Sequence, residues 1–280
     1  MTTKLGEWRL SAIRSLRPVS TEPDIEVNVV LKSVLEKDFA WILMNPDFIL
    51  SSKQIDKLSD YLDRLIHRQP LSYILGNSEF YGLNFVITPN VLIPRSETEM
   101  LVEEALLWGK KQHKKIRLLD VGIGSGCIAL SILKNLPGST AVGVDISFQA
   151  IQIAKINEKR LNIHSISLIN GDLAQSLHGK FDLICANLPY IPSQDVIGLV
   201  HARFEPKLAL DGGINGTEII ERLLIQSKNK ILRPGLLLLE IQFDQGERIA
   251  DFANQIFPKC EIRILQDYSG KDRLLRVEID

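Results

Sequence analysis

The chain has 280 residues and a formal net charge of −1, with 45% hydrophobic and 24% charged residues. This composition is typical of a globular protein with room for two modest domains, and the near-zero charge gives no general attraction to nucleic acid or anionic membranes. The first sixteen residues lack the apolar core of a signal peptide, and the longest apolar clusters are far shorter than the roughly twenty residues of a membrane-spanning helix. We therefore expect a cytoplasmic protein without membrane contact.

The three cysteines do not indicate a disulfide framework or a metal site. Cys127, Cys185 and Cys260 are odd in number, and their spacing is not that of metal ligands. Two of them lie inside apolar runs, which is typical of buried, reduced thiols in a cytosolic protein. We expect no bound metal.

The first 75 or so residues have helical patterns throughout. Apolar residues recur at helical spacing between 25 and 38, namely Val27, Val30, Leu31, Val34 and Leu35. Ser51 or Ser52 can cap a second amphipathic helix, and Pro70 ends it. Because this segment contains no glycine-rich loop, metal spacing or obvious nucleophile, we predict a small helical bundle that packs or holds a partner.

The pattern changes after residue 76. Two short β-prone runs around Gly82, in "SEFYGLNFVIT", predict a hairpin. Ser96 and Glu99 have the spacing of a capping box for the helix that follows. We assign residues 1–76 to an N-terminal helical substrate-recognition domain, 77–95 to a β-hairpin linker and 96–280 to a second, larger domain.

From Arg117 onward, short apolar strands alternate with helical stretches. The predicted strands are 117–123, 140–147, 165–170, 181–187, 236–242, 261–267 and 273–279. Such runs are typical of strands buried on both faces, and most of the connections are long enough for a crossover helix. This indicates a doubly wound, largely parallel α/β sheet of seven strands. Only five residues join the last two strands, which predicts an antiparallel edge pair.

The first predicted strand runs into "DVGIGSGCIAL". Gly122, Gly124 and Gly126 allow a tight turn and a close approach of the backbone to a ligand, with a helix N-terminus behind them. The spacing is tighter than that of the dinucleotide fingerprint, and no Lys-Ser/Thr pair follows as in a P-loop. By itself this turn is weak evidence for any one class of nucleotide.

Acidic residues follow the next two predicted strands. Asp145 can accept both hydroxyls of a ribose, or it can cap the helix that begins near Phe148. Asp172 and Leu173 can meet the edge and the face of an adenine, although a solvated turn also explains Asp172. Together with the glycine turn, Asp145 indicates a nucleoside ligand.

The fourth predicted strand ends in Asn-Leu-Pro-Tyr, residues 187–190. A planar nitrogen is a poor nucleophile, but the oxygen of Asn187 and a following backbone carbonyl can accept its two hydrogens and direct its lone pair. Pro189 makes the turn rigid, and Tyr190 can stack on the planar group. Alternatively, Asn187 caps a turn and Tyr190 packs in the core.

This order of motifs resembles the Rossmann-like S-adenosylmethionine-dependent methyltransferases. Residues 70–106, together with 120–130, 204–220, 236–246 and 269–279, resemble more specifically the protein glutamine methyltransferases of the HemK/PrmC type. The resemblance implies transfer of methyl from S-adenosylmethionine to the side-chain amide nitrogen, N5, of the glutamine in the Gly-Gly-Gln motif of peptide chain release factors. It leaves two alternatives open, namely a glutamine of a ribosomal protein and, less favoured, adenine N6 of an RNA.

The resemblance also implies roles for individual residues. The cofactor would be bound by the glycine turn and by three residues farther along the chain. These residues are Gly122, Ile123, Gly124, Ser125 and Gly126 of the turn, and Asp145, Leu173 and Asn187. Asn187, Leu188, Pro189 and Tyr190 would bind the substrate glutamine, and Asn187, Pro189 and Tyr190 would be catalytic. Arg95 and residues 97–99 would line the cofactor entrance.

Three positions depart from the family pattern. Leu188 and Ser96 each replace a usual proline, and Ile123 replaces a common threonine. Leu188 brings the tetrad to the form found in ribosomal RNA adenine dimethyltransferases, but the backbone carbonyl expected to act there is retained. Those enzymes place their helical domain after the catalytic one, and the net charge of −1 gives little sign of the basic surface that binding phosphate needs. The best candidate for such a surface is the basic cluster at residues 110–115, which we interpret as a solvated helix end. We therefore expect a monomer that acts on release factors without direct contact to nucleic acid.

Overall fold

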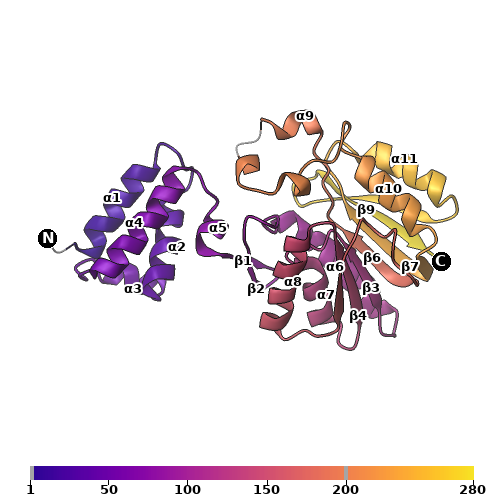
Figure 1. Ribbon diagram of the computed structural model, residues 1–280, viewed down its shortest axis with the longest axis horizontal. Helices are drawn as coiled ribbons and strands as arrows, with labels where there is room; N and C mark the ends of the chain where they lie inside the picture. Colours follow the sequence, from indigo (N-terminus) through magenta and orange to yellow (C-terminus); the bar gives the residue numbers. More distant parts are fainter. Residues whose placement is uncertain (1–2, 199–200) are drawn as a thin grey trace. The chain divides into compact units, whose positions relative to one another are not determined.

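The structure is a computed structural model that describes residues 3–198 and 201–280. It divides into two compact units, Met1–Gly76 and Asn77–Asp280 (Figure 1). The first unit is helical, as its sequence pattern predicts, and contains α1 (Leu5–Leu16), α2 (Pro23–Leu35), α3 (Phe39–Met44), α4 (Ser52–Ile66) and α5 (Leu71–Leu75).

The helical unit has its own hydrophobic core. Leu5, Leu16, Leu31 and Leu58 are fully buried in it, which fits the predicted apolar stripe of α2 and brings α1 and α4 against it. Ser51 caps α4, since its hydroxyl accepts the backbone N–H of Gln54 and the Gln54 side chain accepts the Ser51 N–H.

The second unit begins with the predicted hairpin, formed by β1 (Asn77–Phe80) and β2 (Leu83–Val86). The predicted capping box at Ser96 and Glu99 is wrong. A 3₁₀ turn, η1 (Ser96–Thr98), precedes α6 (Glu99–Lys111), and neither element has a side-chain cap. The Ser96 hydroxyl donates to Glu97 instead, and the Glu99 carboxylate accepts the N–H of Tyr81 in the hairpin turn.

A seven-stranded sheet forms the centre of this unit, in the order β5-β4-β3-β6-β7-β9-β8. Its strands are β3 (Arg117–Val121), β4 (Thr140–Asp145), β5 (Ile166–Asn170), β6 (Phe181–Ala186), β7 (Ile231–Glu240), β8 (Glu261–Gln266) and β9 (Asp272–Ile279). The first five pair in parallel, while β9 is antiparallel to both β7 and β8, as the short connection before it predicts. The strand order reverses at β3, which opens a crevice beyond its carboxyl end.

Helices cover both faces of this sheet (Figure 1). In that view α6, α7 (Cys127–Asn135) and α8 (Phe148–Leu161) lie on one face, and α10 (Glu218–Ser227) and α11 (Gly246–Ile256) lie on the other. The connection from β6 to α10 contains the short elements α9 (Ser193–Val196), η2 (His201–Arg203) and η3 (Lys207–Ala209). The connection from β5 to β6 contains no helix, unlike the other parallel crossovers.

Strand β7 begins five residues before the predicted start at Leu236. Its pairing with β6 is irregular after Phe181, and the Arg233–Pro234 peptide bond within it is cis. Pro234 and Gly235 are strand breakers, so the pattern predicts only the regular part of the strand.

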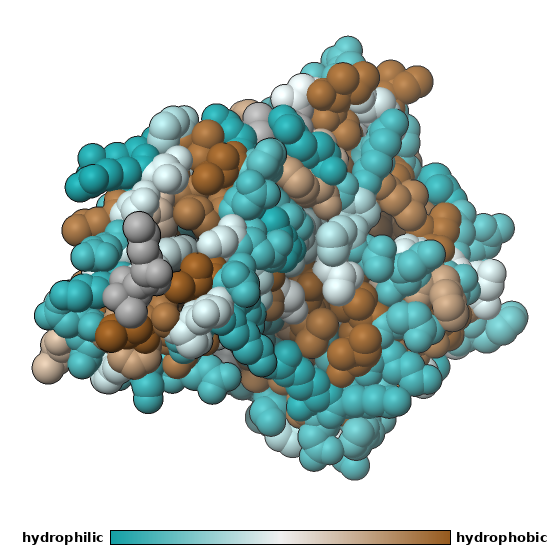
Figure 2. Space-filling model, turned by 60° about the vertical axis from the view of Figure 1, so that its left-hand side comes forward, coloured by the Kyte–Doolittle hydropathy of each residue, from teal (hydrophilic) through white to brown (hydrophobic). Residues whose placement is uncertain are grey.

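The surface is mixed in character. Mainly hydrophilic residues (teal) are interrupted by apolar ones (brown) in Figure 2. The most exposed large apolar side chains include Met44, Ile197 and Ile214, at 79%, 85% and 82%. Among residues 3–198 and 201–280, no helix is long and apolar enough to cross a bilayer.

Candidate active site

A cavity of about 410 Å³ opens at the carboxyl ends of the parallel strands, within the size range of small-molecule sites. Most of the residues predicted from the sequence line it, namely Gly122, Ile123, Gly124, Ser125, Asp145, Leu173, Asn187, Leu188 and Pro189. Gly126 and Tyr190 do not. The strand ends therefore bring together residues that lie up to 67 positions apart, and the cavity is the candidate active site.

The glycine turn between β3 and α7 forms one wall. Gly122, Gly124 and Gly126 have φ angles of 76°, 53° and 84°, which L side chains rarely adopt. Among the described residues, the atom nearest to a Cβ built at Gly124 is the Gly122 carbonyl oxygen at 3.9 Å, so backbone conformation rather than crowding favours glycine there. Gly126 is the N-cap of α7, which places the helix N-terminus behind the turn.

Ile123, one of the three departures, has a physical explanation. Its side chain is buried, and its Cδ1 lies only 2.6 Å from the position that a Cβ would take on Gly143 of β4. The missing side chain of Gly143 therefore leaves the space that the larger isoleucine fills.

Asp145 ends β4 and holds the glycine turn in place. Its two carboxylate oxygens accept the N–H groups of Gly124 and Ser147, each at 2.9 Å. Burial is the main cause of a raised pKa for this carboxyl, and the hydrogen bonds oppose it. The cap of α8 is Ser147 rather than Asp145, since the Ser147 hydroxyl accepts the Ala150 N–H. Each carboxylate oxygen retains a further lone pair with which to accept from a ligand.

Leu173 and Asp172, which follow β5, also line the cavity. Leu173 is buried and has a left-handed backbone, with φ of 51°, an uncommon conformation for a branched residue. The Asp172 carboxylate pairs with the guanidinium of Arg222 on α10. This ion pair explains Asp172 in part, while Leu173 presents an apolar surface to the cavity.

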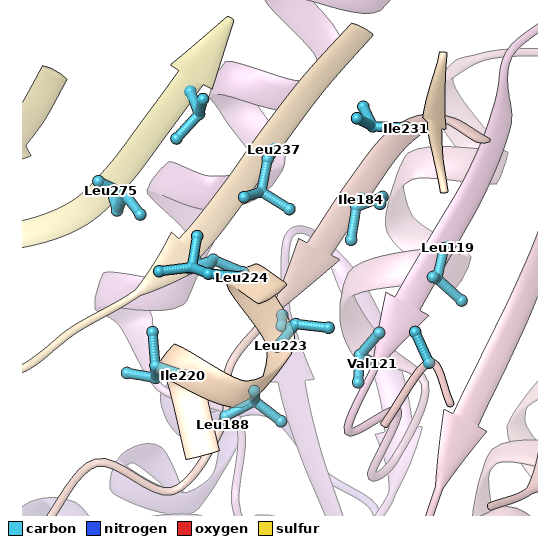
Figure 3. Close-up of a cluster of buried hydrophobic side chains, with 14 of the residues drawn as sticks. Leu119, Val121, Ile184, Leu188, Ile220, Leu223, Leu224, Ile231, Leu237 and Leu275 are labelled. Carbon is cyan, nitrogen blue, oxygen red and sulfur yellow. The ribbon is translucent and has the colours of Figure 1, made fainter. Parts of the chain in front are cut away.

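The tetrad follows β6 directly. Leu188 is 5% exposed and belongs to the core cluster that contains Ile220 and Leu223 of α10, beside Val121 (Figure 3). Its Cδ2 also lies 3.0 Å from the position of a Cβ on Gly122. Leucine in place of the usual proline thus packs under α10 and against the glycine turn.

A second segment braces the tetrad from outside. The Ile191 N–H donates to the Leu210 carbonyl, and the Gly212 N–H donates to the Ile191 carbonyl. The side-chain amide of Gln245 donates to the Tyr190 carbonyl at 2.9 Å. These bonds hold the backbone at the end of the tetrad against residues 210–212 and against Gln245.

Four side chains form a polar chain next to the cavity, with Thr98 and Glu240 buried and Asn187 and Tyr190 half-buried. The Asn187 Nδ2 donates to the Thr98 hydroxyl at 3.0 Å, and that hydroxyl donates to the Glu240 Oε2 at 2.7 Å. The Tyr190 hydroxyl donates to the Glu240 Oε1 at 3.3 Å. Within the described residues, neither the Asn187 Oδ1 nor the Leu188 carbonyl accepts a hydrogen bond.

Electrostatics around Glu240 reflect its burial at the end of β7. Burial raises the pKa of this carboxyl to about 7, against the lowering effects of the Thr98 hydrogen bond and of the Arg273 charge. Burial and the nearby Glu240 charge also raise the pKa of Tyr190, so its phenol stays protonated. Burial is also the main cause that raises the pKa of the Cys127 thiol, which lines the cavity, to about 12.

Of the residues expected at the cofactor entrance, Arg95 and Thr98 line the cavity, whereas Glu97 and Glu99 do not. The Arg95 guanidinium pairs at 2.6 Å with the buried carboxylate of Glu205, which also accepts the Ile93 N–H. Glu205 precedes Pro206, so this pair joins two segments that line the cavity.

Sequence reasoning missed three buried polar residues that organise the site, namely Asn157, Glu205 and Glu240. The Asn157 amide donates to the carbonyls of Val86 and Ser125 and accepts the Val86 N–H, linking the hairpin to the glycine turn. For Glu240 the signal is a charged residue inside the apolar run "LLLLEIQ", whereas Asn157 and Glu205 stand in polar surroundings that give no such signal. In the described part of the chain, no group of three or more His, Cys, Asp or Glu is placed to hold a metal ion.

Known proteins match both units. The family model "PrmC N-terminal domain" matches residues 7–76, and "Methyltransferase small domain" matches residues 98–206. A "Release factor glutamine methyltransferase" of Coxiella burnetii is 36% identical over 94% of this chain and 94% of its own length. A protein of the same name from Geobacter sulfurreducens is 38% identical over 90% of this chain and 88% of its own length.

The chain belongs to the release factor glutamine methyltransferase family. It therefore has a methyltransferase domain, in agreement with the expected fold class and the resemblance drawn from the sequence motifs.

Solved structures support the fold alone. A methyltransferase of Pyrococcus furiosus superposes with a TM-score of 0.54 at 16% identity, over 79% of this chain and 98% of the other. The ribosomal protein L11 methylase of Lactobacillus delbrueckii subsp. bulgaricus gives 0.50 at 23% identity, over 66% of this chain and 80% of the other.

Proposed function

We propose that this chain transfers the methyl group of S-adenosylmethionine to the side-chain amide nitrogen, N5, of the glutamine in the Gly-Gly-Gln motif of peptide chain release factors. Its relatives carry the corresponding name. The observation that carries the proposal is the carboxamide of Asn187, which lines the cavity with its Nδ2 engaged and its Oδ1 free to accept.

The residues of the cavity fit S-adenosylmethionine, which supplies an electrophilic methyl group when bound. Residues 122–126, with their left-handed glycines and the N-terminus of α7, suit the amino-acid part of the cofactor. The Asp145 carboxylate has lone pairs for the ribose hydroxyls, and the apolar side chain of Leu173 suits the face of the adenine.

The tetrad suits an amide nitrogen as the acceptor of the methyl group. The lone pair of such a nitrogen is delocalised, so its nucleophilicity depends on how its two hydrogens are held. The Asn187 Oδ1 and the Leu188 carbonyl are two acceptors adjacent in the chain that can hold both hydrogens and stabilise positive charge developing on nitrogen. Pro189 and Tyr190 fix the turn that presents these acceptors. After methyl transfer, the amide nitrogen loses one proton to an acceptor or to solvent.

The helical unit is proposed to hold the body of the release factor. It has a core of its own, and α3 and the segment after it present exposed apolar side chains, among them Phe39, Leu43 and Met44. Replacing Phe39 and Met44 by serine should raise KM for an intact release factor at least tenfold. KM for a short Gly-Gly-Gln peptide should not change, and a parallel rise for the peptide would contradict this role.

With release factors as substrates, the enzyme would work as a monomer in the cytoplasm, without direct contact to nucleic acid.

Transfer of labelled methyl from S-adenosylmethionine to a purified release factor tests the proposal. A copy of the factor with the Gly-Gly-Gln glutamine changed to alanine, a ribosomal protein preparation and bare ribosomal RNA serve as parallel acceptors. We expect label on the unaltered factor alone. Label confined to RNA or to a ribosomal protein would overturn the substrate assignment.

The variant Asn187→Ala tests the chemistry at the tetrad. Because one transition-state acceptor is removed, turnover should fall about 10²-fold or more, while the cofactor Kd stays within about threefold. Asn254→Ala, at an exposed position on α11, is the matched control and should behave as the unaltered chain. Equal losses of turnover and cofactor affinity at Asn187 would make its role structural.

A further inference from the structure

The polar chain Asn187–Thr98–Glu240–Tyr190 connects three separate segments of the catalytic unit. Glu240 ends β7, Thr98 ends η1, and Asn187 and Tyr190 follow β6. Glu240 and Thr98 are 1% and 2% exposed, so their polar atoms must be satisfied by each other and by the tetrad.

The chemistry of these groups fixes which of them donates and which accepts at each hydrogen bond between the four side chains. An ionised carboxylate only accepts hydrogen bonds, so both hydroxyls must donate to Glu240. The Thr98 hydroxyl has then used its single proton and can only accept from Asn187. Asn187 must therefore turn its NH₂ group toward Thr98, which leaves Oδ1 on the opposite side of the carboxamide.

This direction matters because the two ends of a carboxamide have opposite hydrogen-bonding character. If Asn187 were rotated by 180°, its NH₂ group would face the NH₂ group of the substrate amide, and two donors would oppose each other. A carboxamide already held in the accepting orientation needs no reorientation when the substrate arrives.

We propose that Glu240, acting through the Thr98 hydroxyl, is a positioning residue that orients the Asn187 carboxamide for methyl transfer, and that it also fixes Tyr190 through the phenol. This inference rests on the proposed function. Glu240 and Thr98 need not touch the substrate for this role, since they act through Asn187 and Tyr190.

The charge state of Glu240 then controls which groups donate and which accept in these hydrogen bonds. A protonated Glu240 can donate to the Thr98 oxygen, and the Thr98 proton is then free to turn toward Asn187 and favour the rotated carboxamide. The charged and titratable groups that face Glu240 are Glu97 on η1, Cys127 on α7, Tyr190 after β6 and Arg273 on β9. Of these, Arg273 favours the ionised form and Glu97 opposes it.

Steady-state kinetics of the full chain with S-adenosylmethionine and a release factor test the role of the Thr98 hydroxyl. Thr98→Val keeps the shape of the side chain but removes the hydroxyl, so kcat should fall at least tenfold with the cofactor Kd within threefold. Thr98→Ser restores the hydroxyl and should recover kcat to within threefold. An unchanged kcat in Thr98→Val, or a serine variant as impaired as the valine variant, would overturn the proposal.

The pH profile tests Glu240 separately. In the unaltered protein kcat should rise with pH through a step near the Glu240 pKa of about 7. The reason is that ionised Glu240 makes the Thr98 hydroxyl a donor to Glu240 and an acceptor from the Asn187 NH₂ group. Glu240→Gln should lower kcat and remove this step. Retention of the same step in the glutamine variant would contradict the role of Glu240.

A measurement without turnover keeps this proposal separable from the proposed function. In the NMR spectrum of the unaltered chain, the Asn187 NH₂ protons should show nuclear Overhauser effects to the Thr98 side chain, with assignment by Asn187→Asp. Their absence would refute the orientation even if a release factor is methylated. If another acceptor is methylated instead, the Thr98 series on that acceptor still decides the positioning role.

Discussion

The contact between Ile123 in the glycine turn and Gly143 on β4 allows a quantitative test of how the cofactor wall is built. A Cβ at position 143 would lie 2.6 Å from the Ile123 Cδ1 and 3.1 Å from a methyl of Leu168. Overpacking of this kind costs about 1–3 kcal/mol, partly offset by the lower entropy of the unfolded chain with alanine. We expect Gly143→Ala to lower the free energy of unfolding by about 1–2 kcal/mol.

The partner substitution should relieve the strain. Ile123→Val removes the Cδ1 methyl and by itself costs about 0.5–1.5 kcal/mol. In the double variant the new Cβ occupies part of the space that this methyl leaves, although the Ile123 Cγ1 position remains at 3.0 Å. The double variant should therefore be more stable than the sum of the single effects by about 1 kcal/mol.

Urea unfolding of the unaltered protein, the two single variants and the double variant gives the coupling energy between positions 123 and 143. Calorimetric titration with S-adenosylmethionine measures the cofactor affinity, which should fall if Ile123 moves into the cavity. The control pairs Gly143→Ala with Ile279→Val, a buried methyl deletion on β9, four strands away in the sheet. This pair should be additive within about 0.5 kcal/mol. Additivity of the Ile123 pair as well, together with unchanged cofactor affinity, would refute the packing argument.

Three further predictions concern the tetrad and the core beneath it. Leu188→Ala removes a buried side chain and should lower the free energy of unfolding, measured in urea, by about 3 kcal/mol. Turnover should fall less than tenfold, because the backbone carbonyl of residue 188 is retained. Loss of turnover without loss of stability would contradict this. Gly212→Ala places a Cβ 2.7 Å from the Pro189 carbonyl and should reduce kcat at least tenfold, whereas Gly198→Ala, whose Cβ meets nothing closer than 3.8 Å, should not. The pKa of Asp120 is raised by burial from 3.8 to about 8, so the folded state binds more protons between these values and stability falls as pH rises through this range. Thermal unfolding should show Asp120→Asn gaining on the unaltered chain by roughly 4 kcal/mol from pH 5 to 8; parallel stability curves would exclude an ionising Asp120.

The sequence by itself determined the order of elements and the place of the site. Short apolar runs separated by helical stretches predict a covered, largely parallel sheet, and five of the seven strands pair in parallel. The expected burial on both faces fails for β5 and β8, which lie at the two edges of the sheet and are partly exposed. The glycine turn and Asp145 follow consecutive parallel strands, and the tetrad follows β6. Since the carboxyl ends of parallel strands share one edge of a sheet, their convergence on one cavity follows from local patterns.

The tertiary structure decided what each polar side chain does within that cavity. Thr98 and Glu240 are 142 residues apart, and no periodicity predicts that packing of η1 against the end of β7 brings their oxygens to 2.7 Å. The capping-box pattern at Ser96 and Glu99 was misleading because Glu99 has a more distant partner, the Tyr81 N–H. Periodicity reports which residues are buried, whereas a buried polar group is satisfied by whichever donor or acceptor the packed fold places beside it.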